Sequence, residues 1–189
     1  MKSKPKKVKI KKEKKKQNLV DIKWISTIIL LTFVISIAFS IICELVIPNV
    51  QVLVSIILVL IVILIGVIFD IIGVAVTVAD IKVFNAMASK KVKGSKVALK
   101  LIKNSPKVSS ICNDVIGDIC GIISGSGGAA ISAMLAIELG VKAIVPSLLV
   151  TALIASLTIG GKAIGKGIAV SKANIIIDKF SKILSLFSK

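Results

Sequence analysis

Four polar side chains within two otherwise apolar segments have the chemistry to bind a cation. They are Asp70 in the first segment and Asn113, Asp114 and Asp118 in the second. Carboxylate and amide oxygens are hard ligands that suit Mg²⁺ and similar cations. Asp114 and Asp118 are four residues apart and share a face of a helix, with Asn113 at its edge. Because an ionised carboxylate in hydrocarbon is costly, we expect these side chains to face a protein interior or a watery cavity.

One lysine supports a competing interpretation of the same carboxylates. Lys162 follows the last long apolar segment of the chain. If its ammonium pairs with one aspartate, the cluster is an internal salt bridge and not an ion site. Three aspartates and one lysine still leave a negative charge that tolerates one divalent cation. Both interpretations stay open at the level of sequence.

The residue types exclude several other kinds of site. The chain has no His and no Arg, so an all-imidazole metal site and a bidentate guanidinium clamp are impossible. Its three cysteines lack metal-ligand spacing, and we expect them to be small buried hydrophobes. No nucleophile–base pair, phosphate loop or zinc motif is recognisable, so we do not expect an enzyme. The cysteines are Cys43, Cys112 and Cys120.

The composition indicates a membrane protein. The 189 residues are 56% hydrophobic, with a mean hydropathy of +1.00, which is too apolar for a soluble domain of this size. The net charge of +17 comes from lysines that flank the apolar segments. We attribute these lysines to membrane orientation and to anionic lipid headgroups, and not to nucleic acid. Trp24 is the clearest candidate for a residue at the membrane interface.

The predicted fold is all-α: a polytopic membrane helix bundle with four transmembrane helices and amphipathic juxtamembrane helices. A span needs ~20 apolar residues, and four segments reach that length within a membrane domain at 24–172. A lysine-rich tail precedes them, which we expect to be disordered and retained. Apolar residues at helical spacing among lysines predict amphipathic helices along the inner membrane surface. The tail is 1–23, the spans are about 24–47, 52–78, 110–137 and 143–161, and the amphipathic segments are 80–108 and 173–189.

The lysines also predict the orientation. Of the 26 lysines, all but Lys142 precede the first span, lie between the second and third, or follow the fourth. By the positive-inside rule, both termini are cytoplasmic and the protein is a multi-pass protein of the cell membrane. This topology brings Asp70, the polar residues that open the third span, and Lys162 to one depth in the inner half of the membrane.

Glycines recur at four-residue spacing in the third span, and others lie late in the fourth. Such spacing lets helices pack closely, within one subunit or across a dimer. Alternatively, the small residues clear room for an ion cavity. On the second span, Asp70, Gly73 and Thr77 form a stripe. The other glycines concerned are Gly117, Gly121, Gly125 and Gly161.

The order of these elements resembles the transmembrane domain of the CNNM/CorB/CorC magnesium and cobalt transport-associated family. The similarity covers roughly residues 55–185. It is carried by the span ending FDIIGVAVTVADIKVFNAMASK, by the juxtamembrane stretch LKLIKNSP, and by the segment ICND, which is similar to a Gly-Asn element with Cys112 for the glycine. A small insertion would instead align Gly117 and Asp118 there. The resemblance implies a homodimer that transports or senses Mg²⁺ or Co²⁺, held by hydroxyl, amide and carboxylate groups in a cavity open to the cytoplasm.

The chain departs from that family pattern at its ion ligands. Asp70 stands near the position of a serine, and Gly73 stands where a glutamate is expected. Lys162 replaces a second glutamate, and Gly165 replaces a proline. No pair of nucleotide-binding CBS domains follows within the 189 residues. The resemblance therefore implies either a cation-handling membrane protein with altered ligands or a non-transporting scaffold or partner subunit with a degenerate ion site.

Overall fold

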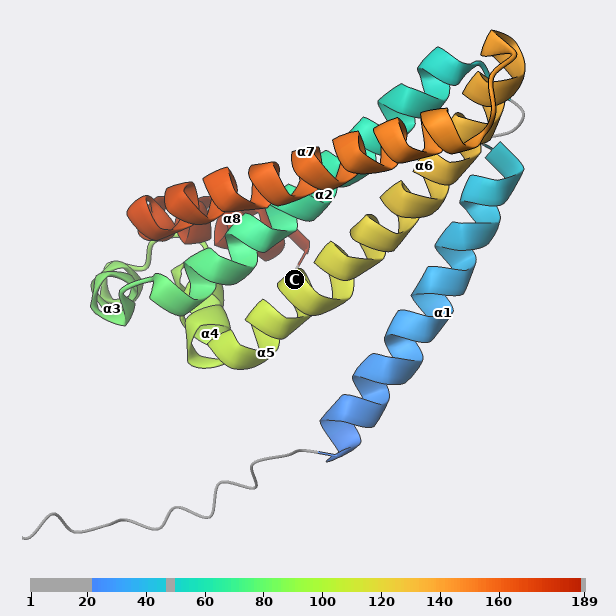
Figure 1. Cartoon of the computed structure of the whole chain (residues 1–189). Coiled ribbons are helices and arrows are strands. Elements are labelled where there is room, and N and C mark those ends of the chain that lie inside the picture. The colour runs from blue at the N-terminus through green and yellow to red at the C-terminus, as the bar shows by residue number, and fades with distance from the viewer. Residues whose placement is uncertain (1–21, 47–49, 188–189) are drawn as a thin grey trace, which may run out of the picture.

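The computed structural model describes residues 22–46 and 50–187, and the regular structure described there is helical (Figure 1). The tail predicted to be disordered lies, up to residue 21, outside the described residues. From residue 111 onward, the third predicted span is first a π-helix and then an α-helix. In chain order the helices are α1 (Ile22–Val46), α2 (Val52–Val78), α3 (Ile81–Ser89), α4 (Ser95–Lys103), α5 (Ser105–Ser110), the π-helix η2 (Ile111–Gly117), α6 (Asp118–Leu139), α7 (Ile144–Ser171) and α8 (Ala173–Phe187).

Four stretches of helix are long and apolar enough to cross a membrane. They are Trp24–Ile42, Val52–Val78, Ser105–Leu139 and Ile144–Ser171. The predicted all-α membrane helix bundle is therefore confirmed. The third stretch begins earlier than predicted because Pro106, which we expected to end a juxtamembrane helix, lies in the first turn of α5. A proline is tolerated in that turn because its missing N–H would have no intrahelical partner there.

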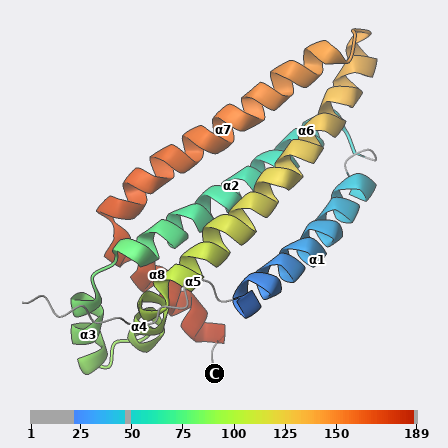
Figure 2. The same ribbon diagram turned by 60° about the horizontal axis from the view of Figure 1, so that its bottom comes forward.

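The long helices run alternately in opposite directions around α2. Helix α2 contacts α5, η2, α6 and α7, whereas α1 packs on the outside against α6. Figures 1 and 2 show that α2 and α7 both end where α5 begins. Helices α3, α4 and α8 gather at this same end, which we call the α3–α4 end. The polar segments that connect or follow the spans are therefore concentrated on one side of the bundle.

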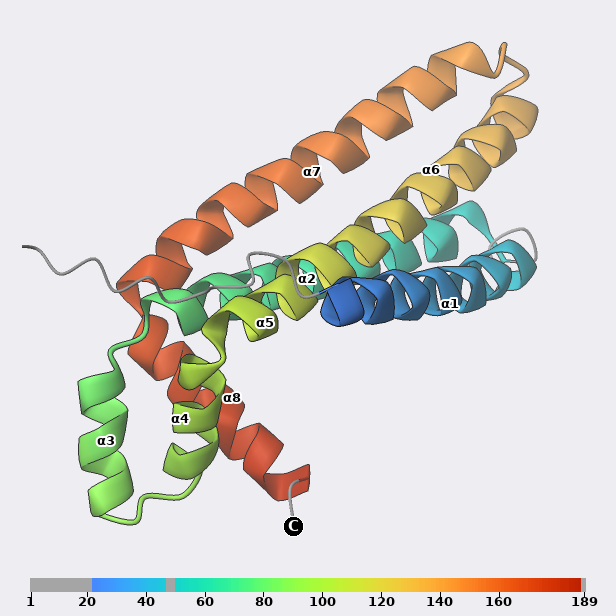
Figure 3. The same ribbon diagram turned by 90° about the horizontal axis from the view of Figure 1, so that it is seen from below.

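The amphipathic helices form a small packed unit at the α3–α4 end. Phe84 of α3, Ala98 of α4 and Ile177 of α8 are fully buried together with residues from the ends of α2 and α7. That these helices lie along the inner membrane surface stays a prediction. In the structure, the centres of their apolar faces pack on one another, and Figure 3 shows α3 and α4 projecting away from the long helices. Burial of apolar surface between the helices stabilises this unit.

Two hydrogen bonds fix the junction between α2 and this unit. The Asp80 carboxylate caps α3 by accepting from the Lys82 backbone N–H at 2.8 Å. The Asp80 N–H donates to Asn174 Oδ1 of α8 at 2.9 Å. The start of the α3–α4 hairpin is therefore tied to α8, a contact between residues far apart in sequence.

Candidate functional site

One face of α2 packs closely against the third span, with glycines at the points of contact. Gly66, Asp70 and Gly73 lie at i, i+4 and i+7 and therefore share this face. A Cβ atom at Gly66 would lie 2.9 Å from Cys120 Cβ, and one at Gly73 would overlap with the side-chain oxygen of Asn113. The close approach on both sides of Asp70 encloses its side chain, which is only 4% exposed.

Two oxygen atoms in this contact are buried without a hydrogen-bond partner. They are Oδ2 of Asp70 and Oδ1 of Asn113, which we call together the polar pair. The Asn113 amide nitrogen donates to Ser109 Oγ at 3.3 Å, so this bond leaves the amide oxygen free. A buried polar atom without a partner costs ~1–3 kcal/mol, and more when it is charged. Two such atoms at one helix contact indicate a site that a ligand, a proton or water completes.

The π-helix η2 determines where Asn113 lies. It covers Ile111–Gly117, directly opposite the Asp70 face of α2. π-Helical turns inside longer helices are rare and are frequently found at functional sites. The sequence prediction treated this region as ordinary α-helix and missed the wider turn. The signal that could have revealed it was the cluster of Asn, Asp and Gly in an otherwise aliphatic segment.

Asp114 and Asp118 share a face, as predicted, but this face does not meet α2. Both side chains are exposed. Ser110 Oγ donates to Asp114 Oδ2 at 2.6 Å. Val115 and Ile119, which neighbour them in sequence, are buried against the α1 side of the bundle. Within residues 22–46 and 50–187, no three His, Cys, Asp or Glu side chains are grouped to hold a metal ion.

Lys162 reaches from α7 to the same π-helical segment. Its Nζ lies 3.5 Å from the position that a Cβ of Gly117 would take, and the side chain is half-buried. No carboxylate of the described chain lies within 4.0 Å of this ammonium. The internal salt bridge considered from the sequence is therefore not formed. Lys162 approaches η2 from one side and Asp70 approaches it from another, without an ion pair between them.

The glycines of the spans divide into packed and open positions. A Cβ at Gly161 would lie 3.0 Å from Val67, and one at Gly165 would lie 2.8 Å from Ile71, so these glycines seat α7 on α2. Gly121 and Gly125 have no atom within 4 Å of the corresponding position. The predicted close helix packing is thus observed at Gly161 and Gly165, whereas the α6 face at Gly121 and Gly125 is open.

A cation–π contact links the beginning of α1 to α5. Lys107 Nζ lies 4.7 Å from the centroid of the Trp24 ring, beside the beginning of α1. Tryptophan and lysine at the end of a span are typical of the interfacial region. Asp114 and Asp118 follow Lys107 within the same candidate membrane span, Ser105–Leu139.

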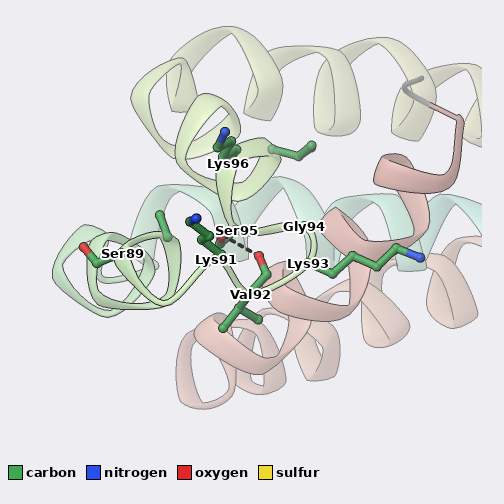
Figure 4. A pocket seen from close by; sticks show the side chains of 9 residues that line it. Ser89, Lys91, Val92, Lys93, Gly94, Ser95 and Lys96 are labelled. Carbon is green, nitrogen blue, oxygen red and sulfur yellow. Dashed lines mark hydrogen bonds between the residues drawn. The ribbon is translucent and has the colours of Figure 1, made fainter.

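A basic hollow lies between α3 and α4 (Figure 4). It has a volume of about 460 Å³, and Lys91, Lys93 and Lys96 are among the residues that line it. Gly94, with φ of 84°, turns the chain into α4, and Ser95 Oγ donates to the Val92 carbonyl at 2.6 Å. The residues that line the hollow include no carboxylate. Its electrostatic character favours anions.

The cysteines behave as expected where the structure describes them. Cys112 and Cys120 are buried and are not in a disulfide. The side chain of Cys43 lies outside the described part of the chain.

Comparison with protein-family models, curated proteins and solved structures gives no match. The resemblance to the CNNM/CorB/CorC family therefore stays a prediction from the sequence. The fold itself defines the class of protein. Its four long apolar helices make the chain an all-α, multi-pass integral membrane protein, with two polar atoms buried without partners between two central spans.

Proposed function

We propose that the protein binds a small cation at the polar pair and transports or senses it from the cytoplasmic side of the membrane. The observation that carries the proposal is the burial of Asp70 Oδ2 and Asn113 Oδ1 without partners in one helix contact. Ionisable groups inside membrane spans are generally functional and are paired with a partner. Because this carboxylate has no hydrogen bond to Oδ2, a bound cation is the partner that best explains it.

Mg²⁺ is the first cation to test. It prefers oxygen ligands, keeps several of its waters and is commonly held through one or two carboxylates. One carboxylate with one amide oxygen meets that requirement without a third acidic ligand. Asp114 and Asp118 add negative potential on the outer side of the same helix, and Lys162 opposes it. Transport of Mg²⁺ or Co²⁺ is also what the family resemblance implies.

The proposed orientation places the α3–α4 end in the cytoplasm. The lysines of the α3–α4 hairpin and the Trp24–Lys107 contact support it through the positive-inside rule. Both termini would then be cytoplasmic in the cell membrane. The basic hollow would face the headgroups of anionic lipids, which attract lysines near the membrane surface.

The test is Mg²⁺ binding to the full chain in lipid nanodiscs, measured by isothermal titration calorimetry. We expect Asp70→Asn to abolish binding and Asn113→Ala to weaken it by about tenfold, the loss of about 1.4 kcal/mol for one ligand. Asp178→Asn is the matched control because Asp178 lies on α8 and pairs with Lys182 at 2.7 Å. Unchanged affinity in Asp70→Asn would reject the site.

A second candidate function is a non-transporting scaffold or partner subunit. The observation that favours it is that the described aspartates are not grouped, while glycines hold α2 tightly against η2 and α7. In that account the half-buried Lys162 side chain packs α7 against η2 near Gly117, so Lys162→Ala destabilises the bundle. In the cation account, the same change removes a repulsive charge and strengthens Mg²⁺ binding. Melting temperature and affinity of this one variant separate the two functions.

A further inference from the structure

The loop that joins α3 to α4 carries a concentration of positive charge without a carboxylate. Between Ile81 and Ser110 the chain has eight lysines and no acidic residue. Three of these lysines line the hollow of about 460 Å³ in Figure 4, namely Lys91, Lys93 and Lys96. Lysine ammonium groups commonly bind phosphate. A hollow of this size holds a phosphate group together with part of the molecule that carries it.

The hollow lies outside the candidate membrane spans. Its lining residues fall between 88 and 97, whereas the second span ends at Val78 and the third begins at Ser105. Figure 3 shows this loop at the end of the α3–α4 hairpin that is remote from the long helices. The three lining lysines are exposed. Anions in the surrounding water can therefore reach the hollow directly.

The backbone holds Lys91 in a conformation that glycine adopts more easily. Lys91 has a φ of 55°, and among residues 22–46 and 50–187 it is the only non-glycine residue with a positive φ. This left-handed region is unfavourable for a residue with a Cβ, and the position after a helix end is usually glycine. Strain of this kind is concentrated at functional sites and ligand clamps. The Lys91 side chain is therefore a candidate ligand.

Hydrogen bonds and one backbone contact fix the turn that carries these lysines. The Val92 N–H donates to the Met87 carbonyl at 3.0 Å and closes the end of α3. Ser95, only 2% exposed, donates through Oγ to the Val92 carbonyl at 2.6 Å. Gly94 lies against α8, because an added Cβ would lie 3.0 Å from the Lys182 backbone nitrogen. The loop is held in one conformation without a ligand, which reduces the entropic cost of binding.

We propose that the hollow is a binding site for a phosphate monoester, with Lys91 and Lys96 as its principal ligands. Figure 4 shows the Lys93 side chain extending away from the other two. A phosphate monoester carries a charge of about −1.5 to −2 at neutral pH and three acceptor oxygens. It therefore matches two ammonium groups better than a singly charged diester does. The monoester belongs either to a lipid headgroup or to a soluble molecule.

This site differs from a general attraction of lysines to anionic lipids, and it does not depend on cation binding. General attraction follows the number of charges, so it treats exposed lysines alike and does not separate monoesters from diesters. The polar pair lies on α2 and η2, outside the residues that line the hollow. Failure of the cation test therefore leaves the phosphate site standing, and failure of the phosphate test leaves the polar pair unchanged.

The test is ³¹P nuclear magnetic resonance of the full chain in phosphatidylcholine nanodiscs, with EDTA present to remove divalent cations. One arm adds glycerol 3-phosphate, a soluble monoester. The other arm replaces part of the lipid with phosphatidic acid, whose headgroup is a monoester, or with phosphatidylglycerol, a diester control. We expect the protein to broaden or shift the resonance of at least one monoester and to leave that of phosphatidylglycerol unchanged. The arm that responds identifies the source of the phosphate.

Single substitutions separate the hollow from diffuse charge. Lys91→Gly should weaken monoester binding by about tenfold, while its melting temperature stays close to the wild type because glycine adopts a φ of 55° without strain. Lys96→Gln, on the other side of the loop, should weaken binding by a similar factor. Lys82→Gln is the matched control, since it removes the same charge from an exposed position at the other end of α3. Asp70→Asn should also bind the monoester normally.

Three results would overturn the proposal. They are the lack of a monoester response in both arms, an equal response of phosphatidic acid and phosphatidylglycerol, and a loss in Lys82→Gln as large as that in Lys91→Gly. Melting temperatures establish that each variant is folded before its binding is compared.

Discussion

Gly73→Ala tests the polar pair through a single added methyl group. Gly73 lies one turn of α2 from Asp70, and the side chain of Asn113 rests directly on it. The position of the new Cβ overlaps with Asn113 Oδ1 and lies 2.7 Å from Asn113 Cγ and 3.1 Å from Nδ2. Because the clashing atoms are the far end of a side chain, Asn113 has to rotate while the helices stay in place.

The expected effect on stability is a modest loss, and the effect on binding is separate from it. Adding a methyl group to a packed contact costs ~1–3 kcal/mol, and replacing glycine by alanine in a helix returns about 0.5–1 kcal/mol. The net destabilisation is therefore about 0–2.5 kcal/mol. Rotation of Asn113, however, displaces the amide oxygen that we propose as a ligand, so Mg²⁺ affinity should fall by about tenfold or more, at about 1.4 kcal/mol per factor of ten.

The assay is the melting temperature of the full chain in nanodiscs, measured with and without Mg²⁺. Bound cation raises the melting temperature by an amount that grows with affinity, so Gly73→Ala should lose most of that rise. Gly121→Ala is the matched control, since its new methyl group has no neighbour within 4 Å. A Mg²⁺-dependent rise of wild-type size in Gly73→Ala, with the control also normal, would refute the role of Asn113.

Three further predictions use other contacts. Asp70→Asn should raise the melting temperature without cation, because it removes an unpaired buried charge, and should abolish the Mg²⁺ effect; a lower melting temperature would mean that Asp70 has a protein partner. Gly66→Val should destabilise the bundle by ~1–3 kcal/mol because its Cβ meets Cys120 Cβ at 2.9 Å, whereas Gly125→Val should not. Lys107→Gln should remove a cation–π contact of ~0.5–1 kcal/mol and change the emission of Trp24, the chain's single tryptophan; an unaltered spectrum would contradict the contact.

The spans were predictable because hydrophobicity and length decide them locally. The sequence also correctly indicated that Asp114 and Asp118 share a helix face. It could not decide which neighbour each face meets, because the rotation of the third span depends on how Val115 and Ile119 pack near α1. Helix rotation is a property of the packed bundle, so Asn113 and not Asp114 is the residue that faces α2.

The π-helix and the juxtamembrane unit also depend on distant contacts. The wider turn at Ile111–Gly117 lies where the third span packs against Gly66 and Gly73 of α2, a contact that the polar residues of its own segment do not show. Similarly, the amphipathic pattern of α3 and α4 is equally suited to lipid and to protein. In the structure, Phe84 of α3 and Ile177 of α8 are buried in one cluster, a packing that the pattern alone could not predict.

The most direct test of the polar pair is the infrared absorption of its carboxylate. Difference spectra of the full chain in nanodiscs, recorded with and without Mg²⁺ and compared with Asp70→Asn, report the state of Asp70 itself. We predict a Mg²⁺-dependent shift of a carboxylate band that is absent in Asp70→Asn and present in Asp178→Asn. Identical difference spectra for the wild type and Asp70→Asn would contradict cation binding at this site.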